Sequence, residues 1–364
     1  MKNNHNYTQA DILGDLTPRE KIIVKINADP ETKRIFSKFD HAQKEKILAF
    51  LSGERGLEVL LDSFFKKLFD PLTNKNRVCS LLSALLGRKV EDYTIMPREG
   101  ELMYEKGSLV IMDILVRLED QSLVDVEMQK IGYCFPSQRS TCYASDLIMR
   151  QYNALRAEYG KKFNYKMIHP VNLFVIIESP DNEFKDSGHY IHKRQVSYSS
   201  GIVLPETVNI TYLTLDSFKK AVQNIIEPLE KWLAFFTFKE PGEIIQFVNA
   251  FPEFLPLYHE ISEFRKDPKE AIYMYSEALA VLDHNTELYM IEEKQQEIDA
   301  MQVEINSLQS ENVSLQSEND SLQSKNDSLQ SENDSLQIKL KSADREKLSL
   351  AEKLAEYESK YGKL

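Results

Sequence analysis

A seven-residue unit repeats near the C-terminal end of this 364-residue chain and restricts that part to one kind of structure. Between Asn306 and Leu340 the unit reads NSLQSEN, VSLQSEN, DSLQSKN, DSLQSEN and DSLQIKL. With Leu308 at heptad position d, the d positions are almost all apolar from Met301 to Leu364. A seam of this period keeps one side of a helix against a partner helix, which is typical of a coiled coil.

The a positions of the same heptads indicate how many helices take part. Four consecutive a positions hold asparagine, and an Asn at a can bond its twin across a two-stranded parallel axis at a cost in stability. We therefore expect a parallel homodimer formed through residues 291–364. The alternative is a solvated low-complexity helix or a disordered segment, because Ser, Asn and Asp are mediocre helix formers and each central heptad buries one Leu. The four asparagines are Asn312, Asn319, Asn326 and Asn333.

Composition narrows the class of protein for the chain as a whole. Hydrophobic residues make up 42% and charged residues 28%, as in a folded protein. The formal charge of −12 argues against a surface coated with basic residues for non-specific nucleic-acid binding, although a local basic groove stays open. There is no run of 18 apolar residues and no apolar signal core, so we expect a cytoplasmic protein without membrane contact. Cys79, Cys134 and Cys142 form no CxxC pair, which predicts reduced thiols.

The body of the chain alternates between helical and strand-like patterns, which predicts an α/β fold. Helical spacing is expected over 17–69, with one helix at Leu57–Phe69, and over 76–86, 137–159 and most of 214–289. Strand-like runs are expected at 109–118, 123–131, 171–177, 196–198 and 208–213.

The two runs at 109–118 and 123–131 predict a hairpin with unusual charges. Asp113 lies inside an apolar run, while Asp125, Glu127 and Gln129 alternate with Val or Met residues. Alternation places those three polar side chains on one face of the strand. Two carboxylates on neighbouring strands can share Mg²⁺ or Mn²⁺, and such a metal activates water for attack on a phosphodiester.

Loop length decides whether Asp113 and Glu127 share a face. A loop of three or five residues places them together, whereas a four-residue loop, Glu119 to Ser122, separates them unless a bulge intervenes. The alternative interpretation is a half-exposed antiparallel strand, in which the polar residues are solvated and Asp113 pairs with an arginine. Other catalytic motifs are missing: the sequence has no HExxH, no P-loop and no G-x-S-x-G.

Five motifs follow one another in an order that resembles a known family. The first three are Asp62-Ser-Phe-Phe-Lys-Lys-Leu-Phe69, Leu81-Leu-Ser-Ala-Leu-Leu-Gly87, and the pair of Met112-Asp113-Ile-Leu-Val with Val126-Glu127-Met-Gln129. The last two are Arg139 with Tyr143, Ser145 and Gln151, and Pro228-Leu-Glu-Lys-Trp-Leu-Ala-Phe-Phe236. Together they resemble the PD-(D/E)XK nuclease superfamily, and within it the Rpn family of recombination-promoting nucleases, also described as transposases.

The resemblance implies a fold and a division of the chain. The fold is a restriction-endonuclease-like core, with a mixed central sheet flanked by helices, followed by the C-terminal coiled coil. The expected division is an N-terminal helical segment over 1–54, the nuclease-like domain over 55–240, a helical extension over 241–290 and the heptad coiled coil over 291–364.

The resemblance also implies a site. Asp113 and Glu127 would bind Mg²⁺ or Mn²⁺, with the Met128 carbonyl as a further ligand. Gln129 stands where most of the superfamily has lysine, and an amide can orient water but supplies no positive charge. Arg139 or the metal itself would then supply that charge.

A first-helix acid completes the implied site. It would be Asp62, or Glu58 one turn earlier, because residues four apart lie on one side of a helix. Lys130 is a poor replacement for the missing lysine, since strand parity turns it to the other face.

The implied function is a metal-dependent DNA endonuclease, a hydrolase linked to transposition or recombination. The alternative is a decayed nuclease fold that serves as a DNA-binding or oligomerising scaffold, since Gln129 replaces lysine and the chain is acidic.

Overall fold

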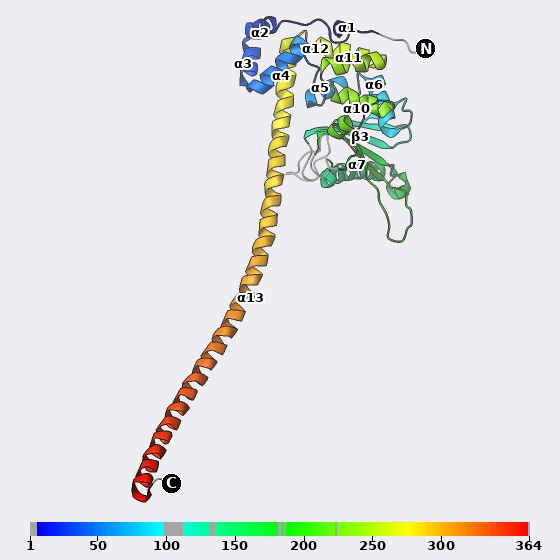
Figure 1. The fold of residues 1–364 in the computed structure, drawn as a ribbon. Coiled ribbons are helices and arrows are strands. Elements are labelled where there is room, and N and C mark those ends of the chain that lie inside the picture. Colours follow the sequence, from blue (N-terminus) through cyan, green and yellow to red (C-terminus); the bar gives the residue numbers. More distant parts are fainter. Residues whose placement is uncertain are drawn as a thin grey trace. The chain divides into compact units, whose positions relative to one another are not determined.

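The structure is a computed structural model in which residues 6–97, 112–131, 136–180, 184, 187–222 and 224–362 are described. The chain divides into two units, residues 1–291 and 292–364. The helices of the first unit precede and surround a sheet, and Figure 1 shows their order along the chain. The helices before the sheet are α1 (Gln9–Leu13), α2 (Arg19–Ala28), α3 (Pro30–Lys38), α4 (His41–Ser52), α5 (Asp62–Leu68) and α6 (Lys75–Leu86).

A mixed six-stranded sheet forms the centre of the first unit, with strand order β1-β2-β3-β4-β6-β5. Strands β3, β4 and β6 run parallel, whereas β1–β2, β2–β3 and β5–β6 pair antiparallel. The expected α/β fold with a mixed sheet is therefore confirmed. The strands are β1 (Tyr93–Ile95), β2 (Ile114–Leu118), β3 (Leu123–Ile131), β4 (Val171–Ser179), β5 (Ile191–Lys193) and β6 (Val208–Thr214).

Helices cover both faces of this sheet. Helix α7 (Pro136–Tyr159) connects β3 to the parallel strand β4 and packs on one face, where Ala144 and Leu147 contact Leu115 and Leu123. The core on the other face is shared by α5, α6 and the helices that follow β6. Those later helices are α9 (Leu215–Ala221), α10 (Pro228–Thr237), α11 (Pro241–Ala250), α12 (Leu255–Phe264) and α13 (Pro268–Tyr361). Figure 1 shows α10 and α7 on opposite sides of β3. Short 3₁₀ turns lie at η1 (Gly160–Lys162), η2 (Tyr165–Met167) and η3 (Pro252–Phe254).

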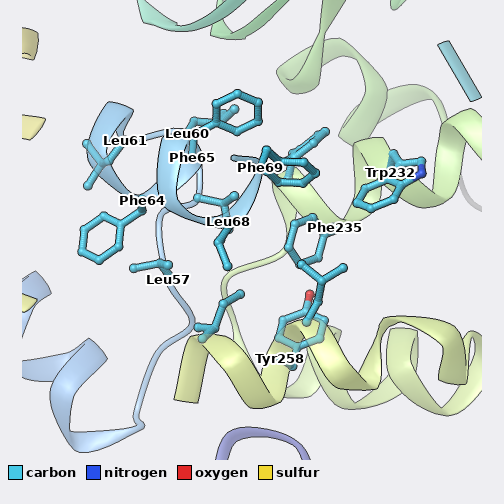
Figure 2. Packing of buried hydrophobic residues seen from close by; sticks show 14 of the residues in the cluster. Leu57, Leu60, Leu61, Phe64, Phe65, Leu68, Phe69, Trp232, Phe235 and Tyr258 are labelled. Carbon is cyan, nitrogen blue, oxygen red and sulfur yellow. The ribbon is translucent and has the colours of Figure 1, made fainter. Parts of the chain in front are cut away.

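Aromatic rings join α5 to α10 in the larger core (Figure 2). The Phe69 ring is fully buried and lies 4.8 Å from the Phe65 ring centroid and 5.6 Å from that of Trp232. Phe235 and Phe236 pack against the same ring. This packing fixes α5 beside the sheet, which matters because α5 carries two of the charged residues of the candidate site.

Three expected elements differ in the structure. The first strand of the hairpin was expected to include Met112 and Asp113, but both precede β2, which begins at Ile114. The expected helix at Leu57–Phe69 begins only at Asp62, because Leu57, Leu60 and Leu61 are buried in a non-helical segment (Figure 2). The expected strand at 196–198 is wrong: the strand forms at Ile191–Lys193, where its backbone pairs with β6. Residues 109–111 of the expected hairpin and Cys134 lie outside the described part of the chain.

The second unit is the C-terminal part of α13, which contains the heptads. Its d-position leucines from Leu308 to Leu336 are 55–63% exposed, so within this chain they contact no core. In the ranges that the structure describes, no helix is long and apolar enough to cross a membrane.

Candidate functional site

A tight turn between β2 and β3 sets the geometry of the candidate site. Leu118 N–H donates to Ser122 O at 2.9 Å, so the loop is the three residues Glu119–Gln121. Gln121 adopts the left-handed conformation, with φ of 66°, that such hairpin loops require. The three-residue alternative is therefore the one that forms, and Asp113 and Glu127 lie on the same face.

Asp113 joins the hairpin from just before β2 rather than from inside it. Its backbone N–H donates to Glu127 Oε1 at 3.2 Å, and its own Oδ2 accepts from Met128 N–H at 2.9 Å. The side chain is 12% exposed. These two bonds hold the Asp113 carboxylate beside that of Glu127.

Helix α5 brings a cation to the same place. Lys66 Nζ lies 3.7 Å from Asp113 Oδ1 and 2.8 Å from Asp62 Oδ1, one turn earlier on the helix. Sequence reasoning identified Asp62 but missed Lys66. The signal was present, since Lys66 belongs to the motif that carries Asp62, but only the fold places it against Asp113.

Two carboxyl groups of β3 are buried. Asp125 is 0% and Glu127 8% exposed, because β3 lies between two strands and α7 covers the face to which they point. Burial raises the pKa of Asp125 well above its usual range, and the negative charge of Asp113 raises it further. Burial also raises the pKa of Glu127, followed by the charges of Asp125 and Asp113. The interpretation of a solvated strand is therefore wrong for these two residues.

The described residues bring little positive charge to Asp125 and Glu127. Among the described residues no lysine or arginine forms an ion pair with Asp125. Arg150 lies near enough to lower the pKa of Asp125, but it pairs with Asp146 at 2.6 Å. An arginine partner for Asp113 was the alternative expectation; among the described residues, Lys66 is a cation that pairs with Asp113.

Gln129 and Arg139 occupy different surroundings. Gln129 is half-buried, and its Oε1 receives no hydrogen bond from the part of the chain that is described. Arg139 lies on α7, where its Nη2 donates to Tyr143 Oη at 3.0 Å and its guanidinium lies 5.3 Å from the Tyr143 ring centroid. Gln129 thus shares the strand face of Glu127, whereas Arg139 contacts Tyr143 on its own helix.

Glu58 does not lie on the helix of Asp62, so its expected placement one turn earlier is wrong. It lies in the buried segment before α5 and pairs with Lys130, and with Lys46 at 3.5 Å. Burial raises the pKa of Glu58, but Lys130, Lys239 and Lys46 outweigh it and lower the pKa to about 2. Lys130 is on the face opposite Gln129, as strand parity predicts.

The residues at the hairpin fit a hard divalent cation. In the described ranges no three His, Cys, Asp or Glu side chains stand together as a complete ligand set. Mg²⁺ needs no such set, because it is usually held by one or two carboxylates and keeps several waters. A cation between Asp113 and Glu127 would also offset the repulsion that raises the Glu127 pKa.

The Glu58 ion pairs predict a specific loss of stability in acid. Because the folded-state pKa is about 2 against 4.5 for a free glutamate, the stabilisation is complete above pH 4.5 and is lost as the pH falls toward 2. Glu58→Gln should lower the free energy of unfolding at neutral pH by roughly 2–3 kcal/mol and flatten its decline in acid. Urea unfolding followed by the fluorescence of Trp232, the single tryptophan, measures both effects.

Glu20→Gln is the matched control, since Glu20 is exposed at the start of α2. Equal pH dependence in the two variants would contradict the assignment of this stabilisation to Glu58.

Comparison with known proteins identifies the family. A family model described as PD-(D/E)XK nuclease family transposase matches residues 59–291, a segment that contains α5, the hairpin and α7. No curated protein and no solved structure matches the chain. The mixed sheet flanked by helices agrees with the restriction-endonuclease-like fold of this family. Because the match covers well over half of its length, the chain belongs to the PD-(D/E)XK nuclease transposase family.

Proposed function

We propose that this protein is a metal-dependent DNA endonuclease that hydrolyses phosphodiester bonds during transposition or recombination. The observation that carries the proposal is the juxtaposition of the Asp113 and Glu127 carboxylates next to the buried Asp125, with raised pKa values for Glu127 and Asp125. Ionising these buried carboxyl groups is costly, and a cation bound between them would offset that cost. Membership of a nuclease family supports the same function.

Mg²⁺ or Mn²⁺ would be held by Asp113 and Glu127, with the Met128 carbonyl as a further ligand. When bound, such an ion lowers the pKa of water and offsets charge on the phosphate. The Met128 N–H fixes the Asp113 carboxylate, and α7 excludes solvent from the Asp125 side of the strand. Gln129 orients the attacking water through its amide.

Lys66 supplies the positive charge that Gln129 cannot. Its ammonium group lies between Asp62 and Asp113, at the open end of the hairpin, where a phosphate oxygen can reach it. Asp62 positions Lys66, which gives the first-helix acid a role that does not require it to bind metal. Arg139 on α7 would be an alternative source of this positive charge.

A catalytically decayed scaffold is the second candidate, and one observation favours it. Gln129 occupies the strand position at which most of the superfamily has lysine, so the strand itself supplies no cation. In that case the protein binds DNA and oligomerises but cuts nothing. The two candidates differ in one measurable property: the nuclease cuts DNA when a divalent metal is added, and the scaffold does not.

Cleavage of supercoiled plasmid with Mg²⁺, Mn²⁺ or EDTA tests the proposal. We expect cleavage with either metal and none with EDTA. Asp113→Ala and Glu127→Ala should each reduce the rate roughly 10³-fold, because each removes a metal ligand that stabilises the transition state by several kcal/mol. Gln129→Ala should reduce it less, since water can replace an orienting amide.

Glu119→Ala is the matched control, because Glu119 is an exposed carboxylate in the loop of the same hairpin. It should cut at the wild-type rate. Unchanged rates for Asp113→Ala and Glu127→Ala would remove the proposed site, and no cleavage with any metal would select the scaffold.

The role of Lys66 predicts a graded series. Lys66→Ala should lower kcat by about 10²-fold, whereas Lys66→Arg keeps the charge and should recover much of the loss. Lys67→Ala is the neighbouring control, since Lys67 pairs with Glu270 on α13 rather than with the hairpin. Equal rates for the Ala and Arg variants of Lys66 would show that its charge takes no part.

The heptads supply the second part of the proposal, a parallel homodimer through 291–364. Their d-position leucines are more than half exposed in the single chain, so an apolar seam is left to be covered. The asparagines at a favour a second copy in parallel register. Two catalytic domains on one dimer would bring two sites to one duplex.

A chain truncated after Ile291 tests the dimer. We expect the full-length protein to sediment as a dimer and the truncated chain as a folded monomer that still unfolds cooperatively, because its core lies within the first unit. Analytical ultracentrifugation and urea unfolding give the two measurements. A dimeric truncated chain, or a monomeric full-length protein, would contradict the role of the heptads.

A further inference from the structure

Aromatic rings gather on the surface where α7 ends, far along the chain from the hairpin. The rings of Tyr152 and Tyr165 are nearly parallel, with an interplanar angle of 18° and centroids 6.4 Å apart. Phe163 packs edge-on against both, at 5.4 Å from Tyr152 and 5.2 Å from Tyr165. The Arg156 guanidinium lies 5.4 Å from the Phe163 ring centroid and 5.9 Å from that of Tyr152. The three rings thus pack against one another, with the Arg156 guanidinium beside two of them.

Burial does not account for this cluster. Tyr165 is 74% exposed, and Phe163 and Tyr152 are only partly buried. None of the three belongs to the hydrophobic cores of the sheet as described. An aromatic surface that is left in solvent is available for a ligand that stacks.

Positive charge surrounds the rings. Lys161, Lys162 and Lys166 are exposed, and no ion pair of the described residues involves them. From Arg156 to Lys166 the chain has four basic residues against one acid, Glu158, although the whole chain carries −12. The segment therefore attracts a polyanion locally while the rest of the protein repels one.

We propose that this aromatic–lysine surface, made of Tyr152, Arg156, Phe163, Tyr165 and the three lysines, binds an unpaired strand of DNA. Stacking on aromatic rings needs bases with free faces, which a duplex does not present, and lysines beside the rings contact the phosphates. The inference deepens the proposed function, on which the choice of DNA rests. Single-stranded ends and displaced strands are the DNA that a recombination nuclease meets.

The surface is separate from the hairpin site, and the segment that carries it leads into β4 of the same sheet. The chain leaves it and reaches Pro170, whose carbonyl accepts from Leu123 N–H at the start of β3. Glu127 is four residues further along that strand, or about 13 Å. The segment that carries the aromatic–lysine surface thus leads to the end of the sheet at which β3 begins, and the proposed site of cleavage lies further along β3.

Binding of a fluorescein-labelled single-stranded DNA of mixed sequence to the full-length protein in EDTA tests the inference. Fluorescence anisotropy should show that Tyr165→Ala raises Kd about tenfold, whereas Tyr165→Phe, which keeps the ring, binds as wild type. The double variant Lys161→Ala with Lys162→Ala should reduce the slope of log Kd against log salt concentration by about 1.4.

Two matched controls exclude general effects. Tyr198→Ala removes another exposed tyrosine, and Lys21→Ala with Lys25→Ala removes the same charge from exposed positions on α2; both should leave Kd and its salt dependence unchanged. Wild-type affinity in Tyr165→Ala, or equal effects of the two lysine pairs, would overturn the inference. So would equal competition by a duplex or an RNA of the same sequence.

EDTA prevents metal-dependent cleavage, so this result is independent of the plasmid assay. Loss of cleavage in the hairpin variants with unaltered binding by Tyr165→Ala would refute the surface alone. Tyr165-dependent binding without any cleavage would refute the nuclease and leave the surface in place.

Discussion

The three-residue turn between β2 and β3 determines where every charged group of the hairpin points. Side chains alternate along a strand, so one additional residue in this turn would move Asp113 to the face opposite Glu127. Gln121 allows the short turn by adopting a left-handed conformation that few residues other than glycine and asparagine favour. The left-handed conformation of Gln121 costs a little backbone energy, and the short turn that it allows places Asp113 and Glu127 on one face.

The parallel pairing of β3 with β4 then determines how deeply the carboxyl groups of β3 are buried. Because β3 pairs with β4 and α7 crosses over the same face, Asp125 and Glu127 are enclosed where an exposed hairpin would have left them in water. Enclosure raises the pKa of both groups and makes each more sensitive to a nearby positive charge. The described residues bring little positive charge to these carboxyl groups, so the cation of the proposed site would stabilise their ionised forms.

Local patterns predicted the sheet better than they predicted the site. The alternation in β3 was sufficient to place Asp125, Glu127 and Gln129 on one face, since a strand has a period of two whatever its neighbours are. Loop length could not be read from the sequence, because Ser122 belongs equally well to a turn or to a strand. Glu58 was misplaced for a related reason: Leu57, Leu60 and Leu61 have helical spacing, but they fill the core from a non-helical segment that contains a turn. The contact of Lys66 with Asp113 joins residues 47 positions apart and depends on how α5 packs.

The position of Lys66 changes what Gln129 implies about activity. A lysine on the strand and a lysine on α5 can place an ammonium group at the same position. The electrostatic interaction with a phosphate depends on that position and not on the element that carries the lysine. The stacked rings of Phe65 and Phe69 pack α5 into the core, and the neighbouring Lys66 reaches Asp113 from that helix. If Gln129 stands where the superfamily resemblance implies a lysine, its presence is therefore weak evidence for decay in a chain whose α5 brings Lys66 to Asp113.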